Sequence, residues 1–150
     1  MHSALTLVQQ LSRGALLRAR RGGEVTVRVT AGILEQNGLV LIARRKPGKH
    51  MAGKWEFPGG KIEKGESPEQ SLARELREEL DVRARIGELL CCASYEGEGI
   101  SLELMVYRVE GFEGIPLLRE HQEIRWVEPR EVRSYDLADS DRQVAEKLFR

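Results

Sequence analysis

The stretch GGKIEKGESPEQSLARELREELDV, residues 59–82, holds the pattern that decides the fold of this 150-residue chain. Within it, Glu78 and Glu79 follow Glu75 by three and four positions. Positions so spaced on a helix project within an arc of about 100°. The sequence therefore predicts a row of carboxylates along one side of a helix.

Leucines predict the buried face of the same helix. Leu72, Leu76 and Leu80 share an arc that begins beside Glu79, so the carboxylates are expected at the edge of a buried face. Like charges placed there repel one another unless a cation lies between them. Carboxylate oxygens, with room left for water and substrate phosphates, suit Mg²⁺ or Mn²⁺ better than zinc.

The beginning of the helix is also marked in the sequence. Ser67 can act as N-cap, Pro68 fits the first helical position and Gln70 completes a capping box. Ahead of them lies a Pro-Gly-Gly loop, residues 58–60, in which bare backbone can approach a metal or a phosphate closely. We therefore expect the glycine loop and the acidic helix to face one site.

The spacing of these residues resembles the Nudix box of hydrolases that cleave nucleoside diphosphates linked to another group. The matching positions are Gly60, Glu66, Arg74, Glu75, Leu76, Glu78, Glu79 and Val82. The family usually has glycine where this chain has Asp81, and because that glycine ends the helix, we expect a changed C-cap rather than changed chemistry. The alternative is an ordinary amphipathic helix with Glu–Arg pairs along a solvated face, but fixed residue types at fixed spacing favour the box.

The resemblance implies an α/β fold, with an α/β/α sandwich around a mixed β-sheet. It also implies a metal site for Mg²⁺, with Mn²⁺ as a substitute, made by the Gly60 carbonyl, Glu75, Glu78 and Glu79. Arg74 and Glu66 are expected to orient the helix and its carboxylates rather than to contact substrate. One of the box glutamates, or Glu120 in a late loop, is expected to serve as general base.

The run before the box, KWEFPGGK at residues 54–61, resembles MutT-type nucleoside triphosphate pyrophosphohydrolases. By this resemblance, Phe57 helps to form the base pocket and Lys61 lies near phosphate. Core packing is the alternative for Phe57 and the preferred interpretation for Trp55. Basic residues precede this run, and we expect Arg44 among them to bind substrate phosphates, against the alternative of an ordinary polar loop.

The C-terminal part resembles the cytidine triphosphate pyrophosphohydrolase branch of the MutT relatives. The similar positions are Arg119 to Gln122, Trp126, Pro129, Tyr135, Leu137, Ala138 and Asp141. The likeness implies that Glu120 is a further carboxylate on the metal side. It also implies that Asp141 hydrogen-bonds the base, where a carboxylate can accept from the exocyclic amine of cytosine. The alternatives are a solvated Glu120 and a helix-capping Asp141.

The activity implied is Mg²⁺-dependent hydrolysis of an NTP or dNTP to NMP and pyrophosphate, with water attacking the β-phosphorus. The base, and the choice between ordinary and oxidised or methylated nucleotides, stay open. One alternative is an ADP-ribose or other nucleoside-diphosphate pyrophosphatase, which the lack of proline between Pro68 and Pro116 disfavours. Another is a non-catalytic nucleotide-binding module, which the complete set of box carboxylates disfavours.

The composition of the chain limits the kinds of partner that it is expected to bind. Lys and Arg number 24 and so do Asp and Glu, so the chain lacks the cationic field of a general nucleic-acid binder, and a small nucleotide is the expected partner. No apolar run is long enough to cross a bilayer, which predicts a protein without a membrane partner. Cys91 and Cys92 fit reduced thiols in the cytoplasm. A monomer and a homodimer are both compatible with the sequence.

Two regions are expected along the chain. Residues 1–23 contain arginines but no acidic residue and are predicted to form a helical extension, with a mitochondrial transit peptide as the alternative. Residues 24–150 are predicted to form one Nudix domain. Within it we expect a hairpin of residues 25–34 and 39–43, strands at 82–93, 100–109 and 124–127, a short helix from Pro129, and a last helix capped by Asp139 or Ser140.

Overall fold

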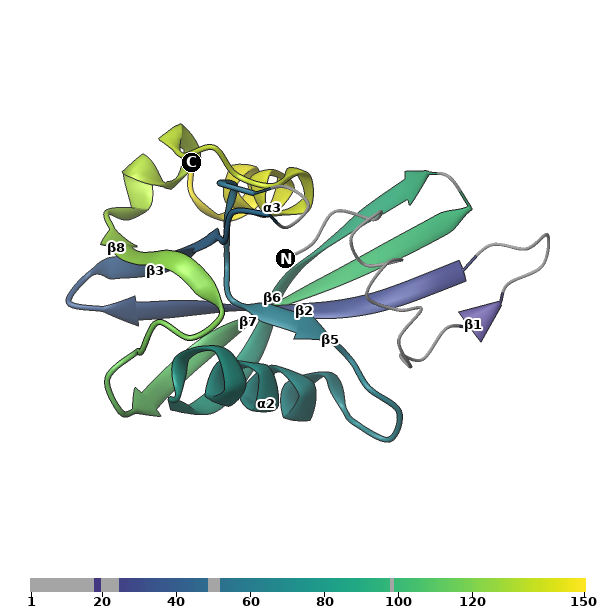
Figure 1. Cartoon of the computed structure of the whole chain (residues 1–150), viewed down its shortest axis with the longest axis horizontal. Coiled ribbons are helices and arrows are strands. Elements are labelled where there is room, and N and C mark those ends of the chain that lie inside the picture. The colour runs from purple at the N-terminus through teal and green to yellow at the C-terminus, as the bar shows by residue number, and fades with distance from the viewer. Residues whose placement is uncertain (1–17, 20–24, 49–51, 98) are drawn as a thin grey trace.

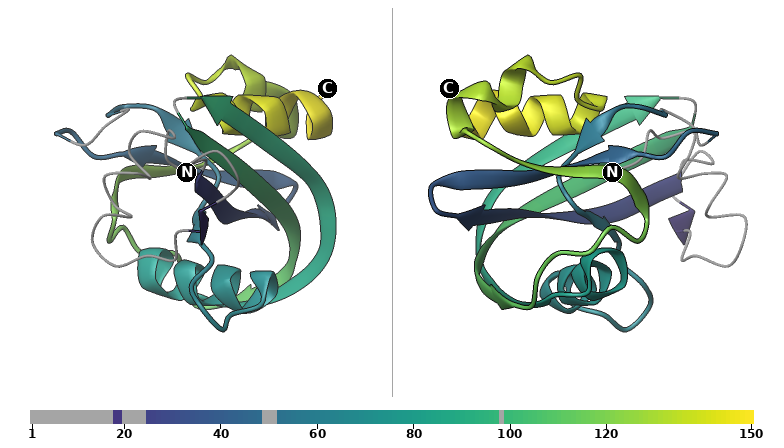
Figure 2. Two further views of the ribbon diagram at one scale, coloured as in Figure 1. Left: turned by 90° about the vertical axis from the view of Figure 1, so that its right-hand side faces the viewer. Right: turned by 60° about the vertical axis from the view of Figure 1, so that its left-hand side comes forward.

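The computed structural model describes residues 18–19, 25–48, 52–97 and 99–150. A mixed β-sheet lies between helices, with α2 on one side and α3 on the other (Figure 1, Figure 2). The strands are β1 (Arg18–Ala19), β2 (Val25–Gln36), β3 (Leu39–Arg45), β4 (Trp55–Glu56), β5 (Gly59–Lys61), β6 (Arg83–Gly97), β7 (Ile100–Glu113) and β8 (His121–Val127). The helices are α2 (Pro68–Leu80), the 3₁₀ helix η1 (Pro129–Ser134) and α3 (Asp139–Leu148). The expected α/β/α sandwich is confirmed.

Strand β2 is the centre of the sheet. It pairs in parallel with β7, from Val25–Ile100 to Leu34–Val109, and antiparallel with β3 and β5. The turn from β2 to β3 uses Asn37 and Gly38, both with positive φ (53° and 78°), as a two-residue hairpin turn requires. The predicted hairpin is confirmed. The separate pairing of β5 with β2 places the start of the box directly on the central strand.

Two apolar cores lie on the two faces of the sheet. On the α2 side, Leu72, Leu76 and Leu80 are fully buried against residues that include Leu34 and Leu41. The predicted leucine face is therefore confirmed, and each leucine contributes about 1.5–3 kcal/mol through burial. On the α3 side, alternating residues of β2 and β7 pack against the last helix. Both helices are thus fixed to the sheet, and α2 presents a defined edge to β5.

The ends of α2 have the expected caps. The Ser67 hydroxyl accepts from the Gln70 amide while the Gln70 side chain accepts from the Ser67 amide, so the capping box is confirmed. Asp81 forms the C-cap in the left-handed conformation, with φ 57° and ψ 37°, and its amide donates to the Arg77 carbonyl. A non-glycine residue can therefore end this helix, as expected for an Asp at the position usually held by glycine.

Other boundaries differ from those predicted. Strands β6 and β7 extend further because they pair from Arg83–Glu113 to Gly97–Ile100. The last helix begins after Ala138 with no side-chain cap, so the prediction that Asp139 or Ser140 caps it was wrong. The segment from Pro129 is a 3₁₀ helix.

The N-terminal prediction falls almost entirely outside the described residues. Of residues 1–23, only Arg18–Ala19 are described, and they form a short strand paired with Thr26 and Val25 of β2. The helical extension and the boundary at residue 24 stay predictions. Within the described part of the chain, no helix is long and apolar enough to span a membrane.

Candidate active site

Gly59 and Gly60 allow β5 to lie in close contact with β2 on one side and with the Glu75 side chain of α2 on the other. Gly60 of β5 pairs with Thr30 of β2. A Cβ on Gly59 would lie 2.1 Å from the Thr30 carbonyl oxygen, and a Cβ on Gly60 would lie 2.4 Å from Cδ of Glu75. Neither space can hold a methyl group. The carboxylate of Glu75 is therefore seated directly on the backbone of the loop.

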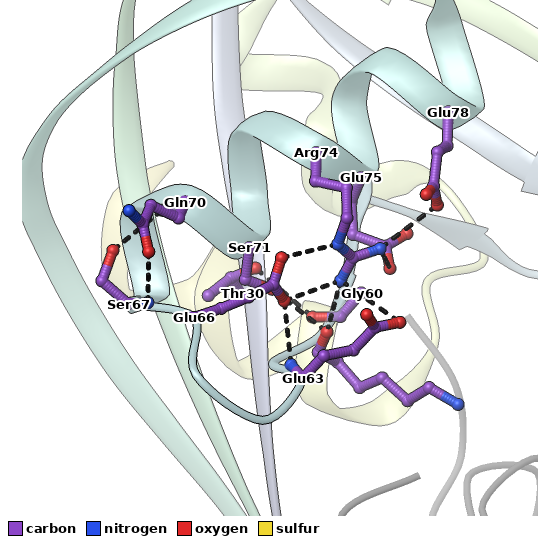
Figure 3. Close-up of polar contacts among 11 residues, drawn as sticks. Thr30, Gly60, Glu63, Glu66, Ser67, Gln70, Ser71, Arg74, Glu75 and Glu78 are labelled. Atoms are coloured by element: carbon purple, nitrogen blue, oxygen red, sulfur yellow. Dashed lines mark hydrogen bonds and ion pairs between the residues drawn. The ribbon is translucent and has the colours of Figure 1, made fainter. Parts of the chain in front are cut away.

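Arg74 connects the loop to the helix (Figure 3). Its guanidinium donates two hydrogen bonds to Glu66, at 2.7 and 3.0 Å, and one to the Lys61 carbonyl at 3.2 Å. The remaining nitrogen contacts Glu75 at 2.9 Å and Glu78 at 3.2 Å. The hydrogen bond to Glu66, together with the nearby carboxylates, raises the pKa of Arg74, so this cation is permanent. Arg74 is placed to orient carboxylates.

Glu79 is the most deeply placed carboxylate of the row. Its side chain is 9% exposed, and one oxygen accepts from the Gly59 amide at 3.3 Å. Burial, together with the charges of Glu75 and Glu120, raises the pKa of Glu79 to about 8. Among the described residues no ion pair includes Glu79. Within the described part of the chain, this buried acid therefore has no contacting cation.

The remaining carboxylates differ in exposure. Burial raises the pKa of Glu75 although Arg74 opposes the shift, whereas Glu78 is 57% exposed. Glu120 lies exposed in the loop between β7 and β8, near enough to Glu79 to affect its pKa. The glutamates of α2 and Glu120 of the loop between β7 and β8 therefore lie around the same part of the molecule, near Glu79.

These residues fit a divalent cation. The donors are hard oxygen atoms, and the deepest of them, on Glu79, is a carboxylate that burial makes costly to ionise without a cation. No group of three His, Cys, Asp or Glu side chains in the described residues is close enough together to hold a metal ion as the side chains stand. Arg74 contacts both Glu75 and Glu78 in this arrangement. A cation would compete with Arg74 for these two carboxylates.

The two predicted phosphate-binding residues, Arg44 and Lys61, have different surroundings. Arg44 of β3 donates to the Gly53 carbonyl at 3.2 Å and lies 3.9 Å from Glu123, with its guanidinium 6.0 Å from the Trp55 ring. Lys61 of β5 is half-buried, and its carbonyl is bound by Arg74 and by the Ser71 hydroxyl. Lys61 belongs to the box itself, whereas Arg44 contacts the loop between β3 and β4 and Glu123 of β8.

The predicted base-binding residues are paired with one another. Phe57 is fully buried and its ring stacks on Phe149, 5.9 Å between centroids. Its amide donates to Oδ1 of Asp141 at 2.8 Å. Burial raises the pKa of Asp141 to about 6, and among the described residues Oδ2 has no hydrogen-bond partner. Trp55 packs in the core, as preferred from the sequence.

Sequence reasoning missed a buried group of ionisable residues. Arg45, Glu56 and His121 are each no more than 5% exposed. His121 Nε2 lies 2.8 Å from one oxygen of Glu56, and Arg45 lies 3.7 Å from the other. Burial lowers the pKa of Arg45, while the charges of Glu79 and Asp141 oppose that shift. The sequence offered one signal, a charged residue between two aromatic residues in the run WEF.

Comparisons with known proteins agree with this geometry. A family profile for the NUDIX domain matches residues 25–148. The CTP pyrophosphohydrolase of Escherichia coli is 41% identical over 115 residues, covering 77% of this chain and 85% of the relative. The 8-oxo-dGTP diphosphatase of the same organism is 36% identical over 125 residues, covering 83% and 97%.

Solved structures show the same fold. The solution structure of the E. coli ORF135 protein superposes with a TM-score of 0.78 at 38% identity, covering 85% of this chain and 91% of that one. A MutT NUDIX hydrolase from Burkholderia pseudomallei superposes with a TM-score of 0.73 at 26% identity, covering 82% and 98%. With the box geometry and the family profile in agreement over most of its length, the chain belongs to the NUDIX domain family.

Proposed function

We propose that the chain is a divalent-metal-dependent pyrophosphohydrolase that converts a nucleoside triphosphate and water to the monophosphate and pyrophosphate. The observation that carries the proposal is Glu79, a buried acid without a contacting cation among the described residues, beside Glu75 and the bare backbone of Gly60. Relatives named CTP pyrophosphohydrolase and 8-oxo-dGTP diphosphatase support the reaction class.

The donors for the metal are the Gly60 carbonyl with Glu75, Glu78, Glu79 and Glu120. Mg²⁺ is the proposed ion, with Mn²⁺ able to replace it, because all these donors are oxygen atoms. When bound, such an ion offsets the charge that develops on the phosphoryl oxygens and lowers the pKa of the attacking water. One of these glutamates acts as the general base.

Other residues hold these donors in place. The Thr30 hydroxyl donates to the Gly60 carbonyl at 3.3 Å, and Gly60 pairs with Thr30 between β5 and β2, so two contacts fix the backbone of the box loop. The paired hydrogen bonds between Arg74 and Glu66 fix the loop against the helix. Lys61 and Arg44 supply positive charge for the phosphate groups.

A cytidine nucleotide is the proposed substrate class. Oδ1 of Asp141 is held by the Phe57 amide, and Oδ2 has no described partner. As a carboxylate, Asp141 can only accept hydrogen bonds. An acceptor at this place favours a base with an exocyclic amine. We further propose action in the cytoplasm, as a monomer or homodimer.

The test is pyrophosphate release by purified protein with Mg²⁺. The panel contains CTP, UTP, GTP, ATP, the four dNTPs, 8-oxo-dGTP, 5-methyl-dCTP and ADP-ribose, compared by kcat/KM. We expect cytidine triphosphates to lead and Glu79→Gln to lower kcat by at least about 100-fold. Full activity in Glu79→Gln would contradict the metal role. Preference for ADP-ribose would contradict the substrate class and leave the metal role standing.

A further inference from the structure

The loop that carries Glu120 is exposed but ends at a buried contact. Ile115, Leu117 and Leu118 are all exposed, and Glu120 itself is exposed. The next residue, His121, is the first of β8 and is 5% exposed. The chain therefore passes from solvent to interior within one residue.

Besides a backbone hydrogen bond of 2.8 Å from the Leu117 amide to the Leu80 carbonyl, the described contacts of this loop are of two kinds. On the surface, Arg119 lies 3.4 Å from Asp81, and Lys46 donates to the Arg119 carbonyl at 3.1 Å. Such exposed pairs contribute about 0–1 kcal/mol. In the interior, Nε2 of His121 lies 2.8 Å from Oε1 of Glu56. A buried hydrogen bond between a histidine and a carboxyl group has a fixed geometry, and losing one partner leaves the other unsatisfied at a cost.

Glu56 is itself held from two directions. Its second carboxylate oxygen lies 3.7 Å from Arg45. In the sheet, β4 carrying Glu56 pairs with β3 at Ala43, and β8 carrying His121 pairs with β3 at Arg45. Glu56 also lies three residues before Gly59, whose amide binds Glu79. The buried contact therefore joins the Glu120 loop to the same strands that lead into the box.

We propose that His121 is a positioning residue for Glu120. The hydrogen bond between His121 and Glu56 fixes the Glu120 loop opposite Glu79 and so completes the divalent-metal site. The inference rests on the proposed function, because it assigns Glu120 to the metal. It concerns the place of a side chain and requires no change of protonation. His121 does not contact substrate in this assignment.

Two substitutions of similar polarity separate positioning from general packing. Glutamine can place its amide nitrogen near the position of Nε2 and donate to Glu56, whereas asparagine is too short to do so. We expect His121→Asn to weaken Mn²⁺ binding and to lower kcat, each about 10-fold, with KM for the nucleotide changed less than about twofold. His121→Gln should stay within about threefold of wild type.

A control variant lies on the other side of Glu120. Arg119→Gln removes an exposed ion pair to Asp81 next to the same glutamate. It should leave Mn²⁺ binding and kcat near wild type, because that pair is solvated. Binding is measured with Mn²⁺ alone, from the electron paramagnetic resonance signal of the free ion, and folding from the thermal midpoint.

A double-mutant cycle with Glu120→Gln decides the inference. If His121 acts through Glu120, His121→Asn should add little to the loss caused by Glu120→Gln. Additive losses, or a folded His121→Asn protein with unchanged Mn²⁺ affinity, would overturn the inference. Equal losses in the Asn and Gln variants would also overturn it. If the wild type binds Mn²⁺ but cleaves no nucleotide, the proposed function fails, and the binding comparison still decides the role of His121.

Discussion

The carboxylate of Glu75 lies directly over the Cα atom of Gly60, where an added Cβ would be 2.4 Å from Cδ of the glutamate. Gly60→Ala should therefore push Glu75 away from the loop and lower kcat/KM by about 100-fold, the scale of effect that a 1 Å misplacement produces. Steady-state kinetics with CTP checks this. The matched control is Gly111→Ala, because the atoms nearest to its Cβ would be those at the flexible end of Arg85. Equal losses in both variants would contradict the role given to Gly60.

Arg74→Lys should lower kcat by about 10-fold while the protein stays folded. A lysine keeps the charge but cannot donate two hydrogen bonds to Glu66 and also reach Glu75. The control is Arg77→Lys on the exposed side of the same helix, which should retain wild-type kinetics. Wild-type kcat in Arg74→Lys would show that charge alone suffices at this position.

Short-range patterns account for what the sequence predicted well. The helix caps at Ser67 and Asp81 and the turn at Asn37 depend on a few neighbouring residues, whose types set the local backbone. The buried contact of Glu56 with His121 depends on β4 and β8, which both pair with β3 and lie far apart in the sequence. Polar residues in a strand are normally assigned to solvent, so their burial could not be deduced from periodicity.

The candidate site also contains residues whose arrangement could be predicted from short-range spacing and residues whose contacts could not. The box glutamates and Arg74 belong to one helix, so their common side could be predicted from spacing. Phe57 and Asp141 are 84 positions apart, and family resemblance alone assigned both of them to base binding, without predicting the hydrogen bond between them. Spacing in the sequence carries no information on a contact of that range.

The raised pKa of Glu79 predicts how metal-free stability depends on pH. In the unfolded chain this carboxyl loses its proton near pH 4.5, and in the folded protein near pH 8. Between these values the folded state binds more protons, so the free energy of unfolding falls as pH rises. At 1.36 kcal/mol per pKa unit the loss is at most about 5 kcal/mol.

Urea denaturation in EDTA, at intervals from pH 5 to pH 8.5, measures this loss. Glu79→Gln should lack it, so the variant should gain stability relative to wild type as pH rises. Adding Mg²⁺ should remove the difference by stabilising the ionised wild-type carboxylate. Parallel pH curves for the two proteins in EDTA would contradict the assignment.

Asp141→Asn should change which base is preferred. In the variant, the Phe57 amide should still bind the side-chain oxygen, as it binds Oδ1 of Asp141 now. The amide nitrogen would then take the place of Oδ2 and act as a donor rather than an acceptor. A donor favours the carbonyl of uracil over the amine of cytosine, so the ratio of kcat/KM for CTP to that for UTP should fall by about 10- to 100-fold, the equivalent of about 1–3 kcal/mol.

Asp139→Asn, at an exposed position in the first turn of the same helix, should leave the ratio unchanged. An unchanged ratio in Asp141→Asn would remove Asp141 from base recognition without affecting the metal site, because Asp141 binds the Phe57 backbone and none of the box glutamates in the described contacts.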